Sequence, residues 1–285
     1  MIPASPRPFD ASVLEAVDGW GAGTAAIVLV DRDGLVGSRG PLDAALPWAS
    51  VTKLASACAV LVAVDRGLVS LDDPAGPPGA AVRHLLAHAS GLAFDDATVI
   101  APPGRMRAYS NTGFDVLADV VARAAGRPFG EVLDAWVLRW LEMTGTRLAG
   151  RAGDGLVGPA LDLARLGREL LAPGVLPSDL LDEASRVAFP GLRGVLPGFG
   201  LQAPNDWGLG FEIRATKTPH WTGVTNSPAT FGHFGRSGAF LWVDPVANLA
   251  LACLTDRPFG PWAAEAWPAL SDAVLQAVDG PADPS

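Results

Sequence analysis

The spacing of apolar residues predicts a helix, a strand pair and a second helix in the first quarter of the chain. Residues 9–20 have apolar side chains at helical spacing. Residues 24–40 read as two strands that turn at Asp33 and Gly34. Residues 50–66 are apolar on nearly every face and end before a glycine. This last segment is expected to be a helix buried on all sides at the centre of the fold.

The rest of the chain is helical in its middle part and strand-like near its end. Glycine and proline separate the helical segments, whereas the later apolar runs are short and bounded by turn residues. A last helical stretch covers residues 262–278. The helical segments are 81–88, 111–126, 129–141 and 159–172, and the strand-like runs are 207–215, 231–235, 237–245 and 248–256.

These elements predict an α+β fold that forms a single domain over residues 1–285. Strands from both chain ends are expected to form one antiparallel sheet flanked by the terminal helices. This α/β lobe would cover about residues 1–64 and 196–285, and about residues 65–195 would form an all-helical lobe. A cleft between the two lobes follows from this arrangement.

The composition narrows the classes of partner. The 285 residues are 49% hydrophobic and 18% charged, which is enough to bury a sizeable core. With 21 Lys+Arg against 30 Asp+Glu the net charge is -9, and no basic stripe is present to bind nucleic-acid phosphates or an anionic membrane. We therefore expect no nucleic acid and no membrane as a partner.

The apolar runs also predict a location for the protein. The first 30 residues lack a basic segment followed by an uninterrupted apolar run and a small-residue cleavage site. The longest apolar run, residues 54–64, is far shorter than the roughly 18 residues that a membrane span needs. The sequence therefore predicts a cytoplasmic protein. Cys58 and Cys253 lie in apolar runs, where we expect unpaired thiols buried in the core.

Two rare residue types direct attention to the chemistry. The only lysines are Lys53 and Lys217, and Tyr109 is the only tyrosine. Ser50 precedes Lys53 by three residues at the start of the buried helix, so both side chains share one face, about 5–6 Å apart at Cβ. A lysine of lowered pKa can take the serine proton, which an arginine cannot. The alternative is a first-turn serine beside a lysine that reaches the surface.

Two later segments add candidate groups. Tyr109 stands in a loop just before a helix that Asn111 could cap, and its phenol could relay protons. Packing of the tyrosine in the core is the alternative. His233 lies in a strand that turns into the next one, and an edge strand there could offer an N–H to a substrate carbonyl. A core histidine is the alternative.

In this order the pieces resemble the serine β-lactamase, DD-peptidase and family VIII esterase superfamily, nearest its class C-like branch. The family pattern is Ser-x-x-Lys, then Tyr-x-Asn, then Lys or His-x-Gly. The surrounding words agree over about residues 20–275, among them WASVTK, VRHLLAHASGL, YSNTGFDVLADVV and GHFGRSGAFLWVDP. The resemblance implies a β-lactamase/transpeptidase-like fold.

The resemblance also implies a set of roles. Ser50 would attack a carbonyl to form an acyl-enzyme, while Lys53 and Tyr109 share the roles of general base and proton donor. Asn111 would orient Lys53 and the substrate. The oxyanion hole would comprise the backbone N–H groups of Ser50 and Arg236. Water then hydrolyses the acyl-enzyme, and no metal or organic cofactor is required.

Further residues are expected around the substrate. His233 would replace the lysine of the family's third motif, and Phe234 stands where a hydroxyl residue commonly helps to hold a β-lactam carboxylate. We expect Arg236 to meet an anionic substrate group. Aromatic residues should line the acyl pocket, although plain core positions are the alternative. The expected substrate-binding residues are Asn111, Trp207, Trp221, His233, Phe234, Gly235 and Arg236.

Other candidates are set aside at this point. Lys217 begins a Lys-Thr-Pro segment, which resembles Lys-Thr-Gly, but its proline lacks an N–H, so a surface loop is expected. His84 and His88 are four residues apart, yet no glutamate stands where a zinc protease needs one, and structural histidines are expected. Asp95 and its acidic neighbour are expected in a solvated turn. No metal site is predicted.

The sequence therefore predicts an intracellular hydrolase of small-molecule carboxylic esters or amides, with weak activity on β-lactams. One alternative keeps the nucleophile and makes the protein a β-lactamase or D-alanyl-D-alanine carboxypeptidase. Another, of a different class, is a non-hydrolytic acyl-binding or sensor protein. A transacylase is also compatible with these residues, because an amine or alcohol can capture an acyl-enzyme. The natural substrate and the oligomeric state stay open.

Overall fold

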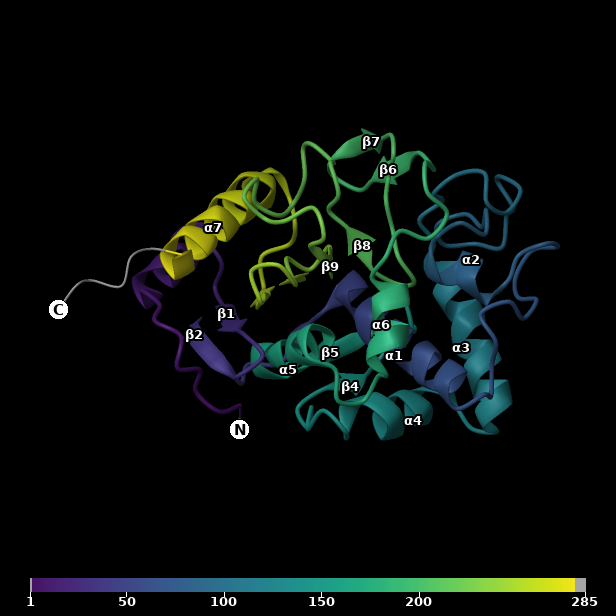
Figure 1. Ribbon diagram of the computed structural model, residues 1–285, viewed down its shortest axis with the longest axis horizontal. Helices are drawn as coiled ribbons and strands as arrows, with labels where there is room; N and C mark the ends of the chain where they lie inside the picture. Colours follow the sequence, from purple (N-terminus) through teal and green to yellow (C-terminus); the bar gives the residue numbers. More distant parts are fainter. Residues whose placement is uncertain (1, 280–285) are drawn as a thin grey trace.

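In the computed structural model, which describes residues 2–279, both ends of the chain contribute to one six-stranded antiparallel sheet (Figure 1). The predicted turn at Asp33 and Gly34 joins the first two strands, and both of their N–H groups donate to Asp31 Oδ1 at 2.9 Å. The strand order is β2 (Leu35–Arg39), β1 (Ala25–Val30), β11 (Leu249–Thr255), β10 (Phe240–Asp244), β9 (Phe231–Phe234) and β8 (Glu212–Ile213).

Both faces of this sheet are covered. Successive side chains of β1 point to opposite faces, so Ile27 and Leu29 join one hydrophobic cluster while Val28 and Val30 join the other. The first cluster includes side chains of η1 (Ala11–Trp20) and α7 (Pro261–Asp279). The predicted helix over residues 9–20 forms as a 3-10 helix. The opposite face is covered by α5 (Ala160–Leu171).

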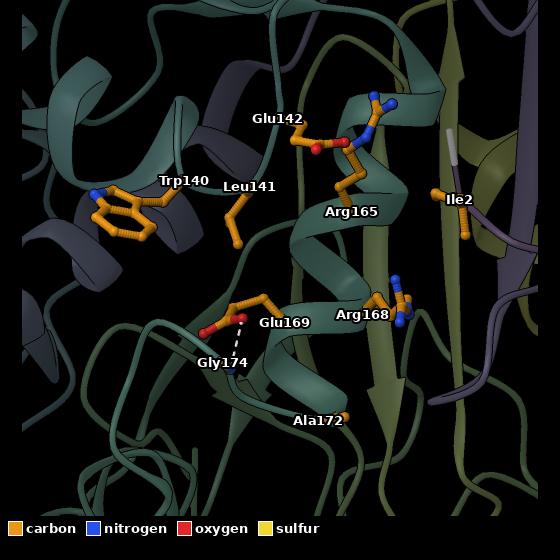
Figure 2. A pocket seen from close by; sticks show the side chains of 9 residues that line it. All are labelled: Ile2, Trp140, Leu141, Glu142, Arg165, Arg168, Glu169, Ala172 and Gly174. Carbon is orange, nitrogen blue, oxygen red and sulfur yellow. Dashed lines mark hydrogen bonds between the residues drawn. The ribbon is translucent and has the colours of Figure 1, made fainter.

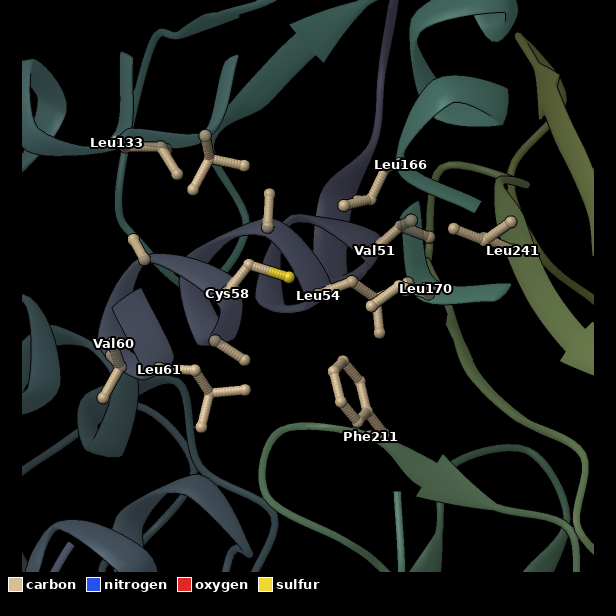
Figure 3. Close-up of a cluster of buried hydrophobic side chains, with 14 of the residues drawn as sticks. Val51, Leu54, Cys58, Val60, Leu61, Leu133, Leu166, Leu170, Phe211 and Leu241 are labelled. Carbon is tan, nitrogen blue, oxygen red and sulfur yellow. The ribbon is translucent and has the colours of Figure 1, made fainter. Parts of the chain in front are cut away.

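The predicted central helix is confirmed. It begins with one 3-10 turn, η2 (Ala49–Val51), and continues as α1 (Thr52–Asp65), which is buried from its first residue through Ala63. Figure 3 shows its apolar side chains between those of neighbouring elements, with Leu170 and Phe211 on one side. Cys58 and Cys253 are buried and unpaired, as predicted. Among residues 2–279, no helix is long and apolar enough to cross a membrane.

The middle of the chain departs from the predicted all-helical lobe. Helix α5 packs on the sheet, because its Gly167 allows close approach: a Cβ there would lie 2.9 Å from Leu241 Cδ1. This part also contains the short strands β4 (Arg147–Leu148), β5 (Leu156–Gly158) and β6 (Gly194–Leu196). They belong to two small sheets, which are completed by β3 (Leu46–Pro47) and β7 (Gly200–Gln202) from outside it. The remaining helices are α2 (Val82–Leu86), α3 (Asn111–Ala125), α4 (Phe129–Leu133), the π-helix η3 (Asp134–Leu138) and α6 (Ser178–Ala184).

The burial of α1 predicts the effect of a truncation within it. Leu61 is fully buried two turns beyond the candidate lysine. We expect Leu61→Ala to lower the free energy of unfolding by about 2–5 kcal/mol, because the substitution leaves a cavity. Leu68→Ala, at a side chain 44% exposed, is the matched control and should change it by about 0.5 kcal/mol or less. Urea denaturation measures both, and equal effects would contradict the prediction.

Candidate active site

Ser50 stands on a tightly held turn. The residue before it, Ala49, has a φ of 45°, a left-handed conformation that is uncommon for a side chain with a Cβ. Trp48 is fully buried and anchors the turn, since its backbone N–H donates to Leu156 O at 2.9 Å and its indole N–H donates to Gly158 O at 3.2 Å. The hydroxyl of Ser50 thereby lines a cavity at the start of α1.

Lys53 lies one turn further along and is fully buried. Its Nζ donates to Asn111 Oδ1 at 2.5 Å and to Gly153 O at 2.8 Å, and it lies 4.8 Å from the centre of the Tyr109 ring. Burial lowers the pKa of Lys53 to about 7, although Asp154 opposes this shift. A substantial fraction of the amine is therefore unprotonated at neutral pH and able to accept a proton.

Tyr109 connects the serine with the third motif. Its phenol is hydrogen-bonded to Ser50 and lies 3.3 Å from His233 Nε2. Desolvation raises the pKa of Tyr109 above its usual value, so the phenol keeps its proton at neutral pH. The structure thus brings Ser50, Lys53 and Tyr109 together, as the sequence predicted. Lys53 and Tyr109 are the two candidate general bases. Of these, the Lys53 amine is the one that is partly unprotonated at neutral pH and can accept a proton.

Asn111 is positioned by a residue that the sequence placed elsewhere. It does not cap α3: the cap is Ser110, whose Oγ accepts from Gly113 N at 3.0 Å, and Asn111 is the first helical residue. Its side chain is therefore free to accept from Lys53 and to donate to Asp95 Oδ1 at 2.9 Å. Asp95 also pairs with Arg151 at 2.9 Å. Asp95 lies in an exposed bend, as expected, but its carboxylate also contacts the site through Asn111.

His233 lies beyond the end of the short edge strand. The edge strand of the sheet is β8, which pairs only with the first two residues of β9. β9 is therefore not the edge strand, but at His233 it has no partner strand on the β8 side. Its Nδ1 is 2.6 Å from Phe234 O, and because a carbonyl can only accept, Nδ1 carries the proton and Nε2 faces Tyr109. Burial lowers the pKa of His233 to about 3. The ring is therefore neutral where the family has a lysine.

Gly235 allows the sheet to touch the serine turn. A Cβ at this residue would lie 2.5 Å from Trp48 O and 3.2 Å from Ser50 N. The backbone of the third motif therefore lies directly against the turn that carries Ser50, as an oxyanion hole formed by the N–H groups of Ser50 and Arg236 would require. The side chain of Arg236 is exposed, with Nη2 3.7 Å from Asp154 Oδ2.

The cavity beside Ser50 has a volume of about 190 Å³ and a mostly apolar lining. Trp207 and Phe234 line it as expected. Trp221 does not: it is buried behind Phe234, with ring centres 5.7 Å apart, and its indole N–H donates to Glu212 Oε2 at 2.9 Å. The lining residues are Ser50, Phe94, Tyr109, Leu196, Pro197, Gly198, Trp207, Glu212, His233, Phe234, Arg236 and Phe259.

Sequence reasoning did not identify a buried ionic group, centred on Glu212, in the wall of this cavity. Glu212 is 1% exposed and accepts from Lys217, from His220 Nε2 at 3.0 Å and from the Trp221 indole. Burial opposes its ionisation, but the charges of His220 and Lys217 outweigh this and hold the pKa of Glu212 well below its usual range. The expectation that Lys217 lies in a surface loop is therefore wrong, because its side chain is buried. One acidic residue within an apolar strand-like run was the available signal for such a partner.

A second, larger cavity has a different character. It has a volume of about 360 Å³ and lies along α5 (Figure 2). Its charged side chains already have partners: Arg165 pairs with Asp162 at 2.5 Å, and Glu169 accepts the N–H of Gly174 at 2.9 Å. Among the described residues that line it, none carries a nucleophilic hydroxyl or thiol. Of these two cavities, the one at Ser50 contains the predicted nucleophile.

Comparison with known proteins accounts for this geometry. A model of the Beta-lactamase family matches residues 10–275. The chain belongs to this family. A beta-lactamase from Mycobacterium bovis (Mb2281c) has the same fold, with a TM-score of 0.92 and 51% identity over 93% of this chain and 99% of that chain. The predicted resemblance and the predicted α+β, β-lactamase-like fold class are confirmed.

Two curated relatives of this Beta-lactamase family member match over shorter stretches. D-alanyl-D-alanine-carboxypeptidase/endopeptidase AmpH of Escherichia coli (strain K12) is 30% identical over 145 residues, which are 38% of this chain and 38% of AmpH. The 6-aminohexanoate-dimer hydrolase of Paenarthrobacter ureafaciens is 29% identical over 161 residues, 53% of this chain and 39% of that protein. The matches thus span about two fifths of the length of these relatives.

The burial of Lys53 predicts an unusual titration. With lysine labelled by 13C at Cε, the protein should give two signals, since Lys53 and Lys217 are the only lysines. We expect the signal that Lys53→Arg removes to titrate at a pH of about 7. Between this pKa and the ordinary value of about 10.4, the unfolded chain holds a proton that the folded chain has released. The contribution of Lys53 to stability therefore rises with pH across this window. A midpoint above about pH 9 would contradict the prediction.

Proposed function

We propose that this protein is a serine hydrolase that cleaves carboxylic esters or amides through an acyl-enzyme on Ser50. The observation that carries the proposal is that Ser50 and Tyr109 line one cavity beside a buried Lys53, whose Nζ lies 4.8 Å from the centre of the Tyr109 ring and whose pKa lies near 7. A hydroxyl becomes an effective nucleophile only when a neighbouring base removes its proton. Lys53 meets this need at neutral pH, and an arginine in its place would stay protonated.

The proposed reaction has two halves. Ser50 Oγ attacks the substrate carbonyl while its proton passes to Tyr109 and the phenol proton passes to Lys53. The tetrahedral oxyanion is held by the N–H groups of Ser50 and Arg236, and its collapse releases the alcohol or amine, which takes the proton back. Water then attacks the acyl-enzyme with the same proton transfers, releasing the acid and restoring the Ser50 hydroxyl. Neutral His233, with Nε2 3.3 Å from the phenol oxygen, adds no charge to this path.

The cavity favours a short apolar acyl group. Its volume of about 190 Å³ is enclosed mainly by aromatic and aliphatic side chains, Trp207, Phe234 and Phe259 among them. The third motif offers Phe234 in place of a hydroxyl residue and a neutral His233 in place of a lysine. Both substitutions remove groups that would bind a β-lactam carboxylate and support ester or amide substrates. The cytoplasmic location and the role of Arg236 toward anionic substrates stay predictions.

A β-lactamase or D-alanyl-D-alanine carboxypeptidase is the second candidate, favoured by the description of the M. bovis relative as a beta-lactamase and by the match to AmpH. Turnover of nitrocefin and of a D-alanyl-D-alanine peptide distinguishes it from the first. The proposal of an esterase or amidase requires a higher kcat/KM for p-nitrophenyl butyrate than for either of these substrates. The reverse order would establish the second candidate.

The mechanism is tested by a time course of p-nitrophenyl butyrate hydrolysis with intact mass recorded alongside. We expect wild type to turn over and to gain one butyryl mass that Ser50→Ala never shows. Lys53→Arg and Tyr109→Phe should lower kcat by about 10²–10⁴, the range for loss of a general acid or base. Ser178→Ala, at an exposed serine outside the cavity, is the control. A burst of acylation without turnover would instead indicate an acyl-binding or sensor protein, and full activity of Ser50→Ala would refute the proposal.

The oxyanion hole is tested at Gly235. A methyl group there would overlap Trp48 O and separate the third motif from Ser50. We expect Gly235→Ala to lower kcat by about 10²–10³, the effect of losing one oxyanion donor. Gly19→Ala is the control, because a Cβ at Gly19 meets no atom within 4 Å. Wild-type kcat in folded Gly235→Ala protein would show that this close approach is not required.

A further inference from the structure

His88 holds the loop of Tyr109 from both sides. Its carbonyl oxygen accepts the N–H of Ala108 at 2.8 Å, and its ring nitrogen Nδ1 accepts the N–H of Ser110 at 3.2 Å. Its ring also lies against the phenol ring, with centres 4.5 Å apart. The residues before and after Tyr109 and the tyrosine ring itself are thus all bound by one residue, which the sequence suggested was a structural histidine.

The conformation of His88 makes these contacts possible. Its φ is 52°, in the left-handed region, just after the end of α2. This turn directs its carbonyl group and its ring toward the same neighbouring segment. Histidine and asparagine enter this region more readily than most other residues with a Cβ. The backbone here is therefore shaped to present two acceptors to the tyrosine loop.

The ring of His88 remains a neutral acceptor. Because a backbone N–H can only donate, Nδ1 has the lone pair and the proton is on Nε2. Nε2 is buried without a hydrogen-bond partner among residues 2–279. Burial, followed by the charge of Lys53, lowers the pKa of His88 well below its usual value. Protonation would cost the bond to Ser110 and leave a buried charge, so the contact persists at all pH values near neutrality.

The hydrogen bond from Ser110 to His88 also helps to position the partner of Lys53. Ser110 caps α3 and is followed directly by Asn111, whose Oδ1 accepts from Lys53 Nζ at 2.5 Å. Tyr109 itself lies in a loop outside helices and strands. Without an anchor on its N–H groups, the loop could move the phenol away from Ser50. His88 thus holds both the Tyr109 phenol and the Asn111 amide beside Lys53. It does so from outside the substrate cavity, because it is not one of the lining residues.

We propose that His88 is a positioning residue that fixes the Tyr109 phenol between Ser50 and Lys53 by accepting the N–H group of Ser110. The inference rests on the proposed function of Ser50, but the geometry it claims can be measured without activity. Tyr109 is the only tyrosine, so protein labelled with ring-13C tyrosine gives signals from this residue alone.

The test compares three variants of one histidine. His88→Asn keeps an acceptor near the place of Nδ1 and suits the left-handed backbone. His88→Leu has a volume close to that of histidine but no acceptor, and His88→Ala replaces it should the leucine variant not fold. His84→Leu is the control, because His84 likewise accepts a backbone N–H, that of Ala81 at 3.1 Å, but lies outside the cavity at Ser50.

We expect wild type and His88→Asn to give one sharp set of Tyr109 ring signals and His88→Leu to give broadened or multiple signals. In p-nitrophenyl butyrate hydrolysis, kcat should fall about 10²-fold or more in His88→Leu, as for loss of the proton relay, with KM within about threefold of wild type. His88→Asn should retain kcat within about tenfold, and His84→Leu should match wild type.

Three results would overturn the proposal. One is a folded His88→Leu or His88→Ala protein with sharp Tyr109 signals and wild-type kcat. Another is a folded His88→Asn protein as inactive as the leucine variant, and the third is a loss that appears only in KM. Failure of the proposed function looks different: wild type itself would show no acylation of Ser50, while the ring signals of the variants would still decide whether His88 positions Tyr109.

Discussion

The burial of a single amine, that of Lys53, is the constraint on which the site depends. An ammonium ion removed from water without a counter-ion is strongly disfavoured, so the group releases its proton and its pKa lies near 7. This requires a helix that is apolar on every side, and α1 meets the requirement from Thr52 to Ala63. A lysine at the start of an amphipathic surface helix would keep its proton and could not activate a serine.

The partners of Lys53 preserve this state. Its nearest acceptors, Asn111 Oδ1 and Gly153 O, are neutral, whereas a carboxylate in direct contact would stabilise the ammonium form and raise the pKa. The carboxylate of Asp95 acts one step further away, on the amide nitrogen of Asn111, and it is paired with Arg151. Charge is thus used to orient the amide at the rim of the site, while the groups that exchange protons remain neutral.

The sheet contributes to the site through the close packing of Gly235 against the turn that carries Ser50. Strands from the C-terminal part of the chain lie beside the N-terminal hairpin, so the end of β9 reaches the turn before α1. Only a glycine at position 235 permits the observed distance to Trp48. Behind this contact, the buried Glu212 holds Lys217 and the indole of Trp221, and so ties the wall of the cavity to the chain that follows β8.

Sequence alone identified the features that depend on short-range geometry. The helical spacing of Ser50 and Lys53, the apolar faces of α1 and the turn at Gly34 are set by covalent structure and local periodicity, so they could be predicted directly. The order of the motifs was sufficient to predict the family.

Features that depend on contacts between distant segments could not be predicted from the sequence in this way. The choice of Ser110 as the cap, the bond from Asp95 to Asn111, the burial of Lys217 and the packing of α5 on the sheet all depend on which surfaces meet. The pKa of Lys53 depends on them as well, because desolvation is the sum of everything that surrounds the amine.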